Sequence, residues 1–338
     1  MYDLRSETSA ETPPKVTTQG DGVRVYHTPA LVAEVVSALK VSSTSRVLDC
    51  TVGEGGHAEA ILEAGAPGCR VLGLDLDPQA IETATERLKH FENRMILVNA
   101  GYQDATELAE RHGFLPLHGV LMDLGLSSLH LEQAERGFSF QREGPLDMRF
   151  SPESDLTAED VVNRYSEAEL ARIIAEYGQE PRARRVAGAI VKGRPVRTTL
   201  ELARLVESAV GRGRRRIHPA TKTFQALRIE VNQELRGLEN SIDRAIDLLD
   251  FGQRICIISY HSLEAKLVKD ALKRAASDCI CPPGTPECRC QHRATVRLIT
   301  KKPIAPSDEE VRINPRTRSA HLRVAEHIEA EGAALAYR

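Results

Sequence analysis

Short apolar runs alternate with amphipathic segments over the first third of the chain. Four runs are almost continuously hydrophobic, at 46–50, 71–75, 95–98 and 119–123. The segments between and before them carry apolar side chains at helical spacing, at 29–39, 58–64 and 78–90. Apolar strands that alternate with helices predict a parallel, doubly wound α/β sheet.

The alternation stops near Leu131, and about a hundred residues follow with helical periodicity and no strand pattern. Helices are predicted there at 158–162, 167–177, 183–191 and 200–210. A long helix over 221–250 then leads into a buried strand at 253–260, and two closing strands are predicted at 296–299 and 320–324. The pattern therefore predicts an α/β domain interrupted by a helical insertion. We expect a flexible tail at 1–22, a discontinuous core at 23–132 and 221–330, and an insertion at 133–220.

Composition narrows the class of protein. With 338 residues, 41% of them hydrophobic and 28% charged, the chain is long enough for a sizeable core and is not of disordered composition. No apolar run reaches the length of a membrane span, and the N-terminus has no apolar signal region, so we expect a cytoplasmic protein without membrane contact. Seven unevenly spaced cysteines argue against a disulfide scaffold.

The net charge of −3 conceals a strong asymmetry within the predicted insertion. Residues 151–180 hold eight acids and two bases, whereas residues 181–228 hold thirteen lysines or arginines and two acids. The basic stretch can form a face that binds a polyanion. Alternatively, it is a solvated helical face that packs against the acidic stretch.

A glycine-rich turn follows the first predicted strand. Residues 53–58 fit the pattern G-x-G-x-x-G/A, and Asp75 ends the second strand twenty-two residues after Gly53. Glycines let the backbone approach a ligand, and an acid at that distance is placed to bind ribose hydroxyls. Taken alone, this pattern fits a nicotinamide-dependent dehydrogenase as well as a purely structural turn.

Two further acids favour S-adenosylmethionine over a dinucleotide. Asp49 lies four residues before Gly53, where its carboxylate would repel a pyrophosphate and suit a cationic ligand, although it can also simply cap the loop amides. Asp123 ends the fourth strand, where a methyl group and its acceptor would meet. Ligands of open α/β sheets lie at the carboxyl ends of the strands, where these acids converge.

Longer stretches resemble one enzyme family, RsmH (MraW), the ribosomal RNA small-subunit methyltransferases H. The resemblance runs from about residue 24 to 327. It rests on these stretches: YHTPAL at 26–31, GEGGH at 53–57, GLDLDP at 73–78, MDLGLSS at 122–128, ERGFSF at 135–140, GPLDMR at 144–149, HPATKTFQA at 218–226, SYHSLE at 259–264 and NPRTRSA at 314–320.

This resemblance implies a class I S-adenosylmethionine-dependent methyltransferase, with a Rossmann-like sheet and an inserted helical domain. The implied reaction is methylation of the exocyclic N4 amine of a cytidine in the decoding region of 16S ribosomal RNA. The implied cofactor contacts are Gly55, Gly56, His57, Asp75, Tyr102, Asp123 and His130. Two of these depart from common family members, because Tyr102 stands where phenylalanine is frequent and Leu129-His130 stands where Pro-Gln is frequent.

The catalytic groups are less constrained by the sequence. Asp123 is the first candidate to hold the acceptor amine, and Ser127 and His261 are further candidates. His261 can equally be a structural hydrogen-bonding residue, and Tyr102 can be core packing. The strand-four motif of well-known amino-methyltransferases, an Asp or Asn followed by two prolines and an aromatic residue, is replaced here by Asp123-Leu124-Gly125.

In the basic stretch, the candidate RNA contacts are Arg212, Arg214, Arg215 and Arg216, which lie in a glycine-punctuated loop. A cysteine cluster, Cys279, Cys281, Cys288 and Cys290, has enough thiols for a tetrahedral zinc site, with reduced free thiols as the alternative. A non-enzymatic RNA-binding or ribosome-assembly factor remains possible, and the motif chemistry alone does not exclude DNA cytosine as the acceptor.

Overall fold

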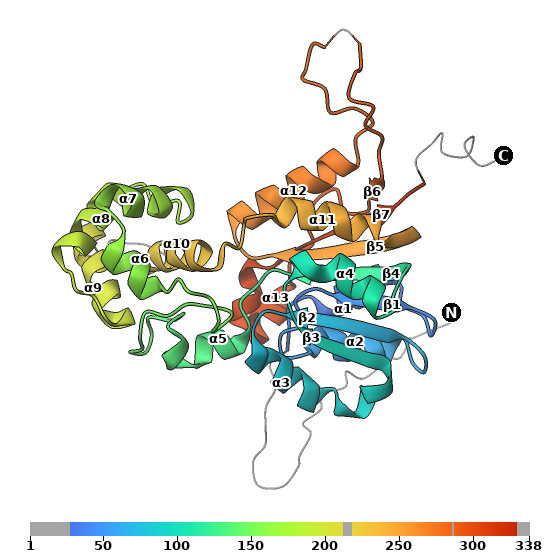
Figure 1. Cartoon of the computed structure of the whole chain (residues 1–338), viewed down its shortest axis with the longest axis horizontal. Helices are drawn as coiled ribbons and strands as arrows, with labels where there is room; N and C mark the ends of the chain where they lie inside the picture. The colour runs from blue at the N-terminus through green and yellow to red at the C-terminus, as the bar shows by residue number, and fades with distance from the viewer. Residues whose placement is uncertain (1–27, 212–217, 286, 330–338) are drawn as a thin grey trace, which may run out of the picture.

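The structure is a computed structural model that describes residues 28–211, 218–285 and 287–329. The tail expected at 1–22 and the candidate RNA contacts Arg212, Arg214, Arg215 and Arg216 lie outside the described residues. At its centre is a seven-stranded sheet in the order β3-β2-β1-β4-β5-β7-β6 (Figure 1). The strands are β1 (Arg46–Asp49), β2 (Arg70–Asp75), β3 (Met95–Asn99), β4 (Leu117–Asp123), β5 (Leu249–Ser259), β6 (Val296–Leu298) and β7 (His321–His327).

The strand directions identify the fold class. Strands β1 to β5 pair in parallel, and β7 pairs antiparallel with both β5 and β6. This order, with one reversed strand near the edge, is the arrangement of class I methyltransferases. The expected Rossmann-like sheet is therefore confirmed, and all seven predicted strands are present. The reversal of β7 was not predicted.

Helices cover both faces of the sheet because successive side chains of each strand point to opposite faces. Val47 and Val71 pack in the cluster under α1 (Val32–Leu39) and α2 (Gly56–Ala64), with α3 (Pro78–Arg87) alongside. Leu48 and Leu72 pack in the cluster under the other face's helices, which are α4 (Ala105–Arg111), α11 (Leu238–Asp247) and α12 (Ser262–Ala275).

A third hydrophobic cluster, the helical cluster, lies to one side of the sheet (Figure 1). It extends from Phe138 to Val231 and includes buried side chains of five helices. These helices are α6 (Ala158–Arg164), α7 (Glu167–Glu176), α8 (Ala183–Lys192), α9 (Thr199–Val210) and α10 (Thr221–Asn232). The four helices predicted before residue 211 are confirmed. Nowhere in the described part of the chain is a helix both long and apolar enough to cross a membrane.

The single long helix predicted at 221–250 is wrong. Helix α10 ends at Asn232, and α11 begins only at Leu238. The backbone between them takes positive φ angles at Gln233 (51°) and Gly237 (76°), which an α-helix does not accommodate. The break turns the chain from the helices at 158–210 back to the sheet. As a result, α10 packs against those helices and α11 packs against the sheet.

Three acidic residues stabilise helix N-termini: Asp160 and Glu169 in the acidic stretch, and Glu201 in the basic stretch. Helices α6, α7 and α9 each begin with a capping box, in which a Ser or Thr hydroxyl and an acid three residues later satisfy backbone amides. Basic residues serve other ends, since Arg194 donates to Val162 O at 2.8 Å and Arg182 donates to Val210 O at 2.6 Å. These contacts account for some of the charge asymmetry as local helix stabilisation.

Gly137 lies in the segment that leads into the helical cluster, and its substitution tests how tightly that segment is packed. Gly137 has φ of 75°, and a Cβ built there would lie 2.2 Å from Pro145 O. Gly113 has φ of 68° with open space around it. We expect Gly113→Ala to lower the free energy of unfolding by about 1–2 kcal/mol, the ordinary cost of a left-handed residue. We expect Gly137→Ala to lower it by about 2–5 kcal/mol, because the backbone must also move.

Urea unfolding of both variants, followed by circular dichroism, measures this difference. Equal losses in the two variants would mean that the segment around Gly137 adjusts freely.

Candidate active site

A cavity of about 310 Å³ opens at the carboxyl ends of the parallel strands. Its volume is in the range of small-molecule sites. The sheet edge, α10 and the segment at 314–317 all contribute to its wall. The expected site residues that line it are Gly56, His57, Asp75, Tyr102, Asp123, Ser127 and His130. Gly55 and His261 are not among the lining residues.

The glycine-rich turn has the shape that the sequence predicts. Gly53 has φ of 52°, and Gly55, with φ of 81°, is the N-cap of α2. A Cβ on Gly55 would meet Leu88 and Ala84, so this glycine lets the turn pack against α3 rather than against a ligand. Gly56 lines the cavity, where it faces Pro29 closely.

Asp75 holds this turn in place. Its carboxylate accepts hydrogen bonds from Gly53 N and from Asp77 N, each at 2.9 Å. Partial burial raises the pKa of Asp75, while the two amides lower it. A carboxylate has about four acceptor positions, so the two amides leave capacity for hydroxyl groups of a ligand in the cavity.

Asp49 lies behind the cavity wall, which Cys50 and Thr51 form at this point. One carboxylate oxygen accepts from Thr51 N at 3.1 Å, while the buried Oδ2 has no hydrogen-bond partner. Burial, reinforced by the nearby Asp123 and Asp75, raises its pKa from 3.8 to about 8. Asp49 therefore caps a loop amide and also keeps one unsatisfied oxygen next to the site.

Asp123 is held at the end of β4 by several groups. Its backbone N–H donates to Thr51 Oγ1 at 2.6 Å, and the Tyr260 hydroxyl is a hydrogen-bond partner of its carboxylate. His57 Nδ1 lies 3.6 Å from Asp123 Oδ2. Burial raises the pKa of Asp123, and the His57 and Tyr260 side chains act in the opposite direction. The carboxylate is thus fixed in position beside the cavity.

His57 is buried and acts through its side chain as well as through the backbone at the start of α2. Its Nε2 lies 3.0 Å from Ala30 O, a contact in which the nitrogen donates. Burial lowers the pKa of His57, and the nearby Asp123 carboxylate opposes that shift. The contact with Ala30 O orients the ring, so that Nδ1 faces Asp123 Oδ2 at 3.6 Å.

These three carboxyl groups decide which ligand the cavity fits. The nearby Asp75 and Asp123 carboxyl groups both raise the pKa of Asp49, so the three acids lie close enough to interact. A pyrophosphate placed here would be repelled. Carboxylates instead fit S-adenosylmethionine, because its sulfonium and ammonium groups are positive and its ribose hydroxyl groups can donate hydrogen bonds to them.

His130 lines the cavity but is engaged elsewhere. Its Nε2 lies 2.8 Å from Asp77 Oδ2, and the same oxygen accepts from Arg136 at 2.8 Å. These two partners lower the pKa of Asp77 against the effect of its burial. The ring also stacks on Phe150, at 5.1 Å between centroids. His130 thus connects the site to the segment at 136–150, and its buried Nδ1 has no hydrogen-bond partner.

The Tyr102 hydroxyl makes a contact that a phenylalanine at this position could not make. The hydroxyl donates to Glu234 O at 3.0 Å, across 132 residues of sequence. Burial raises the pKa of Tyr102 well above its usual value, so the phenol stays protonated. The side chain therefore both lines the cavity and holds the turn between α10 and α11.

The two further catalytic candidates are helix caps. Ser127 accepts from His130 N at 3.3 Å at the start of α5 (Ser128–Glu132), and it lines the cavity. His261 begins α12 with a capping box, accepting from Glu264 N at 3.3 Å, and its Nε2 lies 2.9 Å from Glu264 Oε1. His261 is therefore placed as a structural group beside the cavity.

A buried charge cluster completes the wall, and sequence reasoning missed it. Arg228 donates to both carboxylate oxygens of Glu234 at 2.7 Å and lies 3.6 Å from Glu264. Burial raises the pKa of Glu234, and the guanidinium opposes that shift. The cluster's signal in the sequence was a charge at Arg228 between the apolar residues Leu227 and Ile229. Asn232, on the same helix, accepts from Phe150 N at 2.7 Å.

The segment at 314–318 closes the cavity on the side of α5. Arg316 donates to Glu132 at 3.1 Å, and Asn314 donates to Thr28 O at 3.2 Å. Asn314, Arg316 and Thr317 line the cavity. Arg316 thereby joins this segment to α5, which follows β4.

Asp49→Asn separates the charge of this side chain from its capping role, because the amide oxygen can still accept from Thr51 N. A carboxyl group whose pKa rises from 3.8 to about 8 on folding contributes stability below pH 4 that is lost as the pH rises to 8. We expect Asp49→Asn to be more stable than the unsubstituted protein, by a margin that grows from pH 5 to pH 8. Thermal unfolding of the ligand-free protein across this range measures the margin.

The same variant should bind S-adenosylmethionine about tenfold more weakly in titration calorimetry at pH 9, where the Asp49 carboxyl is ionised, since a negative charge beside a cationic ligand is lost. A margin independent of pH, together with unchanged affinity, would leave capping as the whole role of Asp49.

Comparison with known proteins places these residues in a family context. A model of the MraW methylase family matches residues 24–328. A ribosomal RNA small subunit methyltransferase H of Dehalococcoides mccartyi is 51% identical over 302 residues, which are 89% of this chain and 86% of that protein. A protein of the same name from Thermomicrobium roseum is 47% identical over 315 residues, covering 92% of this chain and 97% of that protein.

Proposed function

The chain belongs to the MraW methylase family, and on that premise we propose that it methylates the N4 amine of a cytidine in the decoding region of 16S ribosomal RNA. S-Adenosylmethionine is the methyl donor. The observation that carries the proposal is that the family match, residues 24–328, contains every residue lining the cavity, from Pro29 to Thr317. Membership of a methylase family rules out the nicotinamide-dependent dehydrogenase.

The cofactor supplies an electrophilic methyl group on a positively charged sulfur. Gly56, Asp75 and Tyr102 line the cavity. The backbone of Gly56 and the carboxylate of Asp75 would hold the ribose of the cofactor, and Tyr102 would cover the adenine. A bound sulfonium would favour the ionised form of the Asp49 carboxyl, and this carboxylate together with that of Asp123 would attract the positive sulfur. The three strand ends fix these groups relative to one another, so the methyl group is presented in one direction.

The acceptor amine needs help because its lone pair is delocalised into the cytosine ring. Asp123 is placed to accept a hydrogen bond from the amine N–H, which fixes the approach and favours pyramidal geometry at nitrogen as the methyl arrives. Tyr260 and the amide of Gly125 hold the carboxylate. The pKa of Asp123 is raised by burial, which also suits it to receive the proton that the methylated amine releases.

The helical cluster is the surface we assign to the RNA. Arg184, Arg185, Lys192 and Arg197 are exposed, whereas Arg182 and Arg194 bond to carbonyl groups at helix ends. The predicted contacts at Arg212–Arg216 stay a prediction. A broad basic face suits a large folded substrate, so we propose the small ribosomal subunit in the cytoplasm as the natural substrate. The target base must leave its stack to reach the cavity.

The decisive experiment uses S-adenosylmethionine with a radiolabelled methyl group and small ribosomal subunits from cells that lack this activity. After RNA digestion, mass spectrometry should find the label in one cytidine, as a single methyl on the exocyclic amine. If subunits, free RNA and DNA all stay unlabelled while the cofactor binds, the chain is a binding or assembly factor.

Two substitutions separate cofactor binding from transfer. Asp75→Ala should weaken S-adenosylmethionine binding at least tenfold, because it removes the ribose acceptor and the clamp on Gly53. Asp123→Asn should retain binding within several-fold and lower the transfer rate at least a hundredfold, as expected for a lost acceptor in the reaction centre. Asp250→Asn, on the exposed end of β5, is the matched control. Calorimetry and single-turnover transfer give the two readouts, and normal transfer by Asp123→Asn would remove this residue from the mechanism.

Charge reversal tests the RNA face. We expect the double variant Arg184→Glu, Arg185→Glu to bind ribosomal RNA at least tenfold more weakly at low salt, with a shallower dependence of affinity on salt concentration. S-Adenosylmethionine binding should not change, because neither residue lines the cavity. Filter binding over a salt series provides the measurement. An unchanged salt slope would place the RNA on another surface.

A further inference from the structure

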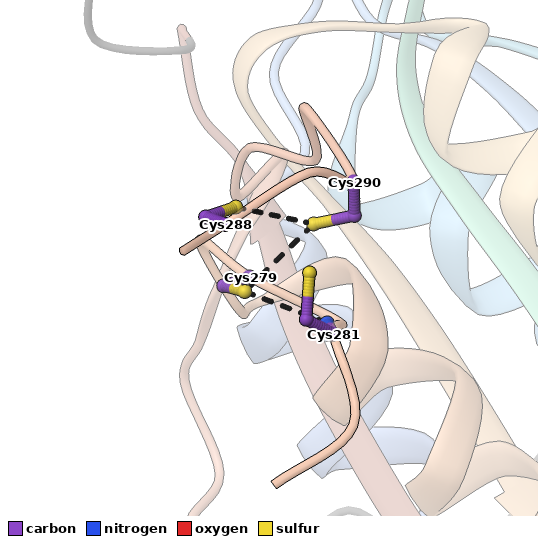
Figure 2. Close-up of side chains that lie close together, drawn as sticks. All are labelled: Cys279, Cys281, Cys288 and Cys290. Carbon is purple, nitrogen blue, oxygen red and sulfur yellow. Dashed lines mark hydrogen bonds between the residues drawn. The ribbon is translucent and has the colours of Figure 1, made fainter. Parts of the chain in front are cut away.

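The loop between α12 and β6 extends away from the body of the protein (Figure 1). It carries two C-x-C pairs, Cys279 with Cys281 in its first half and Cys288 with Cys290 in its second half. Figure 2 shows the four side chains pointing toward one another between the two halves of the loop. The other three cysteines, Cys50, Cys69 and Cys256, are buried in the core.

The sulfur positions match a tetrahedral metal site. All four Sγ atoms lie within 4.8 Å of one another. Cys290 Sγ lies 3.6 Å from Cys288 Sγ and 3.8 Å from Cys279 Sγ. A tetrahedron with zinc–sulfur bonds of about 2.3 Å has edges of about 3.8 Å between its sulfurs. The thiols are thus close to coordination distance from a common centre.

Backbone amides already point at the sulfurs in a reciprocal pattern. Ile280 N, from the middle of the first pair, donates to Cys290 Sγ at 3.4 Å. Arg289 N, from the middle of the second pair, donates to Cys281 Sγ at 3.4 Å. Within the first pair, Cys281 N donates to Cys279 Sγ at 3.4 Å. Amides that donate to a sulfur favour the thiolate and orient it as a ligand.

Hydrophobic packing does not explain the convergence. Cys279 and Cys288 are exposed, and Ile280 beside them is 49% exposed. At its base the loop is anchored by His292 Nε2, 2.9 Å from Arg274 O, and by Thr295 N, which donates to Ala275 O at 2.8 Å. Beyond that base, the contacts that join the two halves of the loop are largely those of the cysteines. Four thiolates so close together need a cation to offset their charge.

We propose that Cys279, Cys281, Cys288 and Cys290 bind one zinc ion and thereby close the loop between α12 and β6. Thiolate ligands in tetrahedral geometry select zinc among the divalent ions. Four protein ligands leave no open position, so the ion is structural. None of the four cysteines lines the cavity, so the site is separate from methyl transfer. The ion would stabilise the folded form of this exposed loop, whose described residues have no hydrophobic core to do so.

Metal analysis of the untagged full chain, purified with a thiol reductant and without chelator, tests the proposal. We expect one zinc per chain. Replacing it with cobalt should give the intense visible absorption of tetrahedral thiolate coordination. The double variant Cys281→Ser, Cys288→Ser should retain less than a tenth of the metal, whereas Arg289→Ala, in the same loop, should retain all of it.

A second readout does not depend on metal content. Trypsin cleavage after Arg289 and Arg293 should accelerate at least severalfold when a chelator removes zinc, and adding zinc back should reverse the change. S-Adenosylmethionine binding should survive in the double variant, so a failed proposal here is distinguishable from a failed methyltransferase assignment.

Two outcomes would overturn the zinc site. The first is a fully reduced chain that takes up no zinc or cobalt at micromolar metal concentration. The second is a chain whose mass shows two disulfides under the reducing conditions of purification, which would make the cluster a redox pair rather than a metal site.

Discussion

Mutual repulsion among Asp49, Asp75 and Asp123 is the constraint on which the site depends. Parallel strands bring their carboxyl ends to one edge, so acids that end neighbouring strands must lie together. The chain tolerates this through backbone amides, which donate to Asp75 and Asp49, and through Tyr260 at Asp123. A positively charged group bound in the cavity would relieve the repulsion that remains.

The sheet and the position of the site could be predicted because both follow from local patterns. Continuous apolar runs mark strands buried on both faces, and the turn after β1 requires glycine where φ is positive. Asp75 and Asp123 were identifiable because each directly follows such a run. The roles of individual side chains at the site remain proposals, even where the structure places them on the cavity wall.

Contacts between distant segments could not be predicted in this way. The Arg228–Glu234–Glu264 cluster depends on how α10 lies against the sheet, and no periodicity in a single sequence encodes that. The break after Asn232 was hidden because the apolar pattern continues through it, and Gly237 alone is a weak signal. The contact of His130 with Asp77, fifty-three residues away, was likewise not predicted.

The insertion also shapes how this chain reaches its fold. Strands β1 to β4 follow one another closely, whereas β4 and β5 pair across the whole helical cluster, for example Leu117 with Leu249. Closing so long a loop costs conformational entropy, and pairings of this kind form slowly. The cluster from Phe138 to Val231 contains its own core, so its collapse shortens the distance that β5 must cover. We therefore expect the half of the sheet that carries β5 and β7 to form late, so that the inserted helices also influence the order in which the sheet assembles.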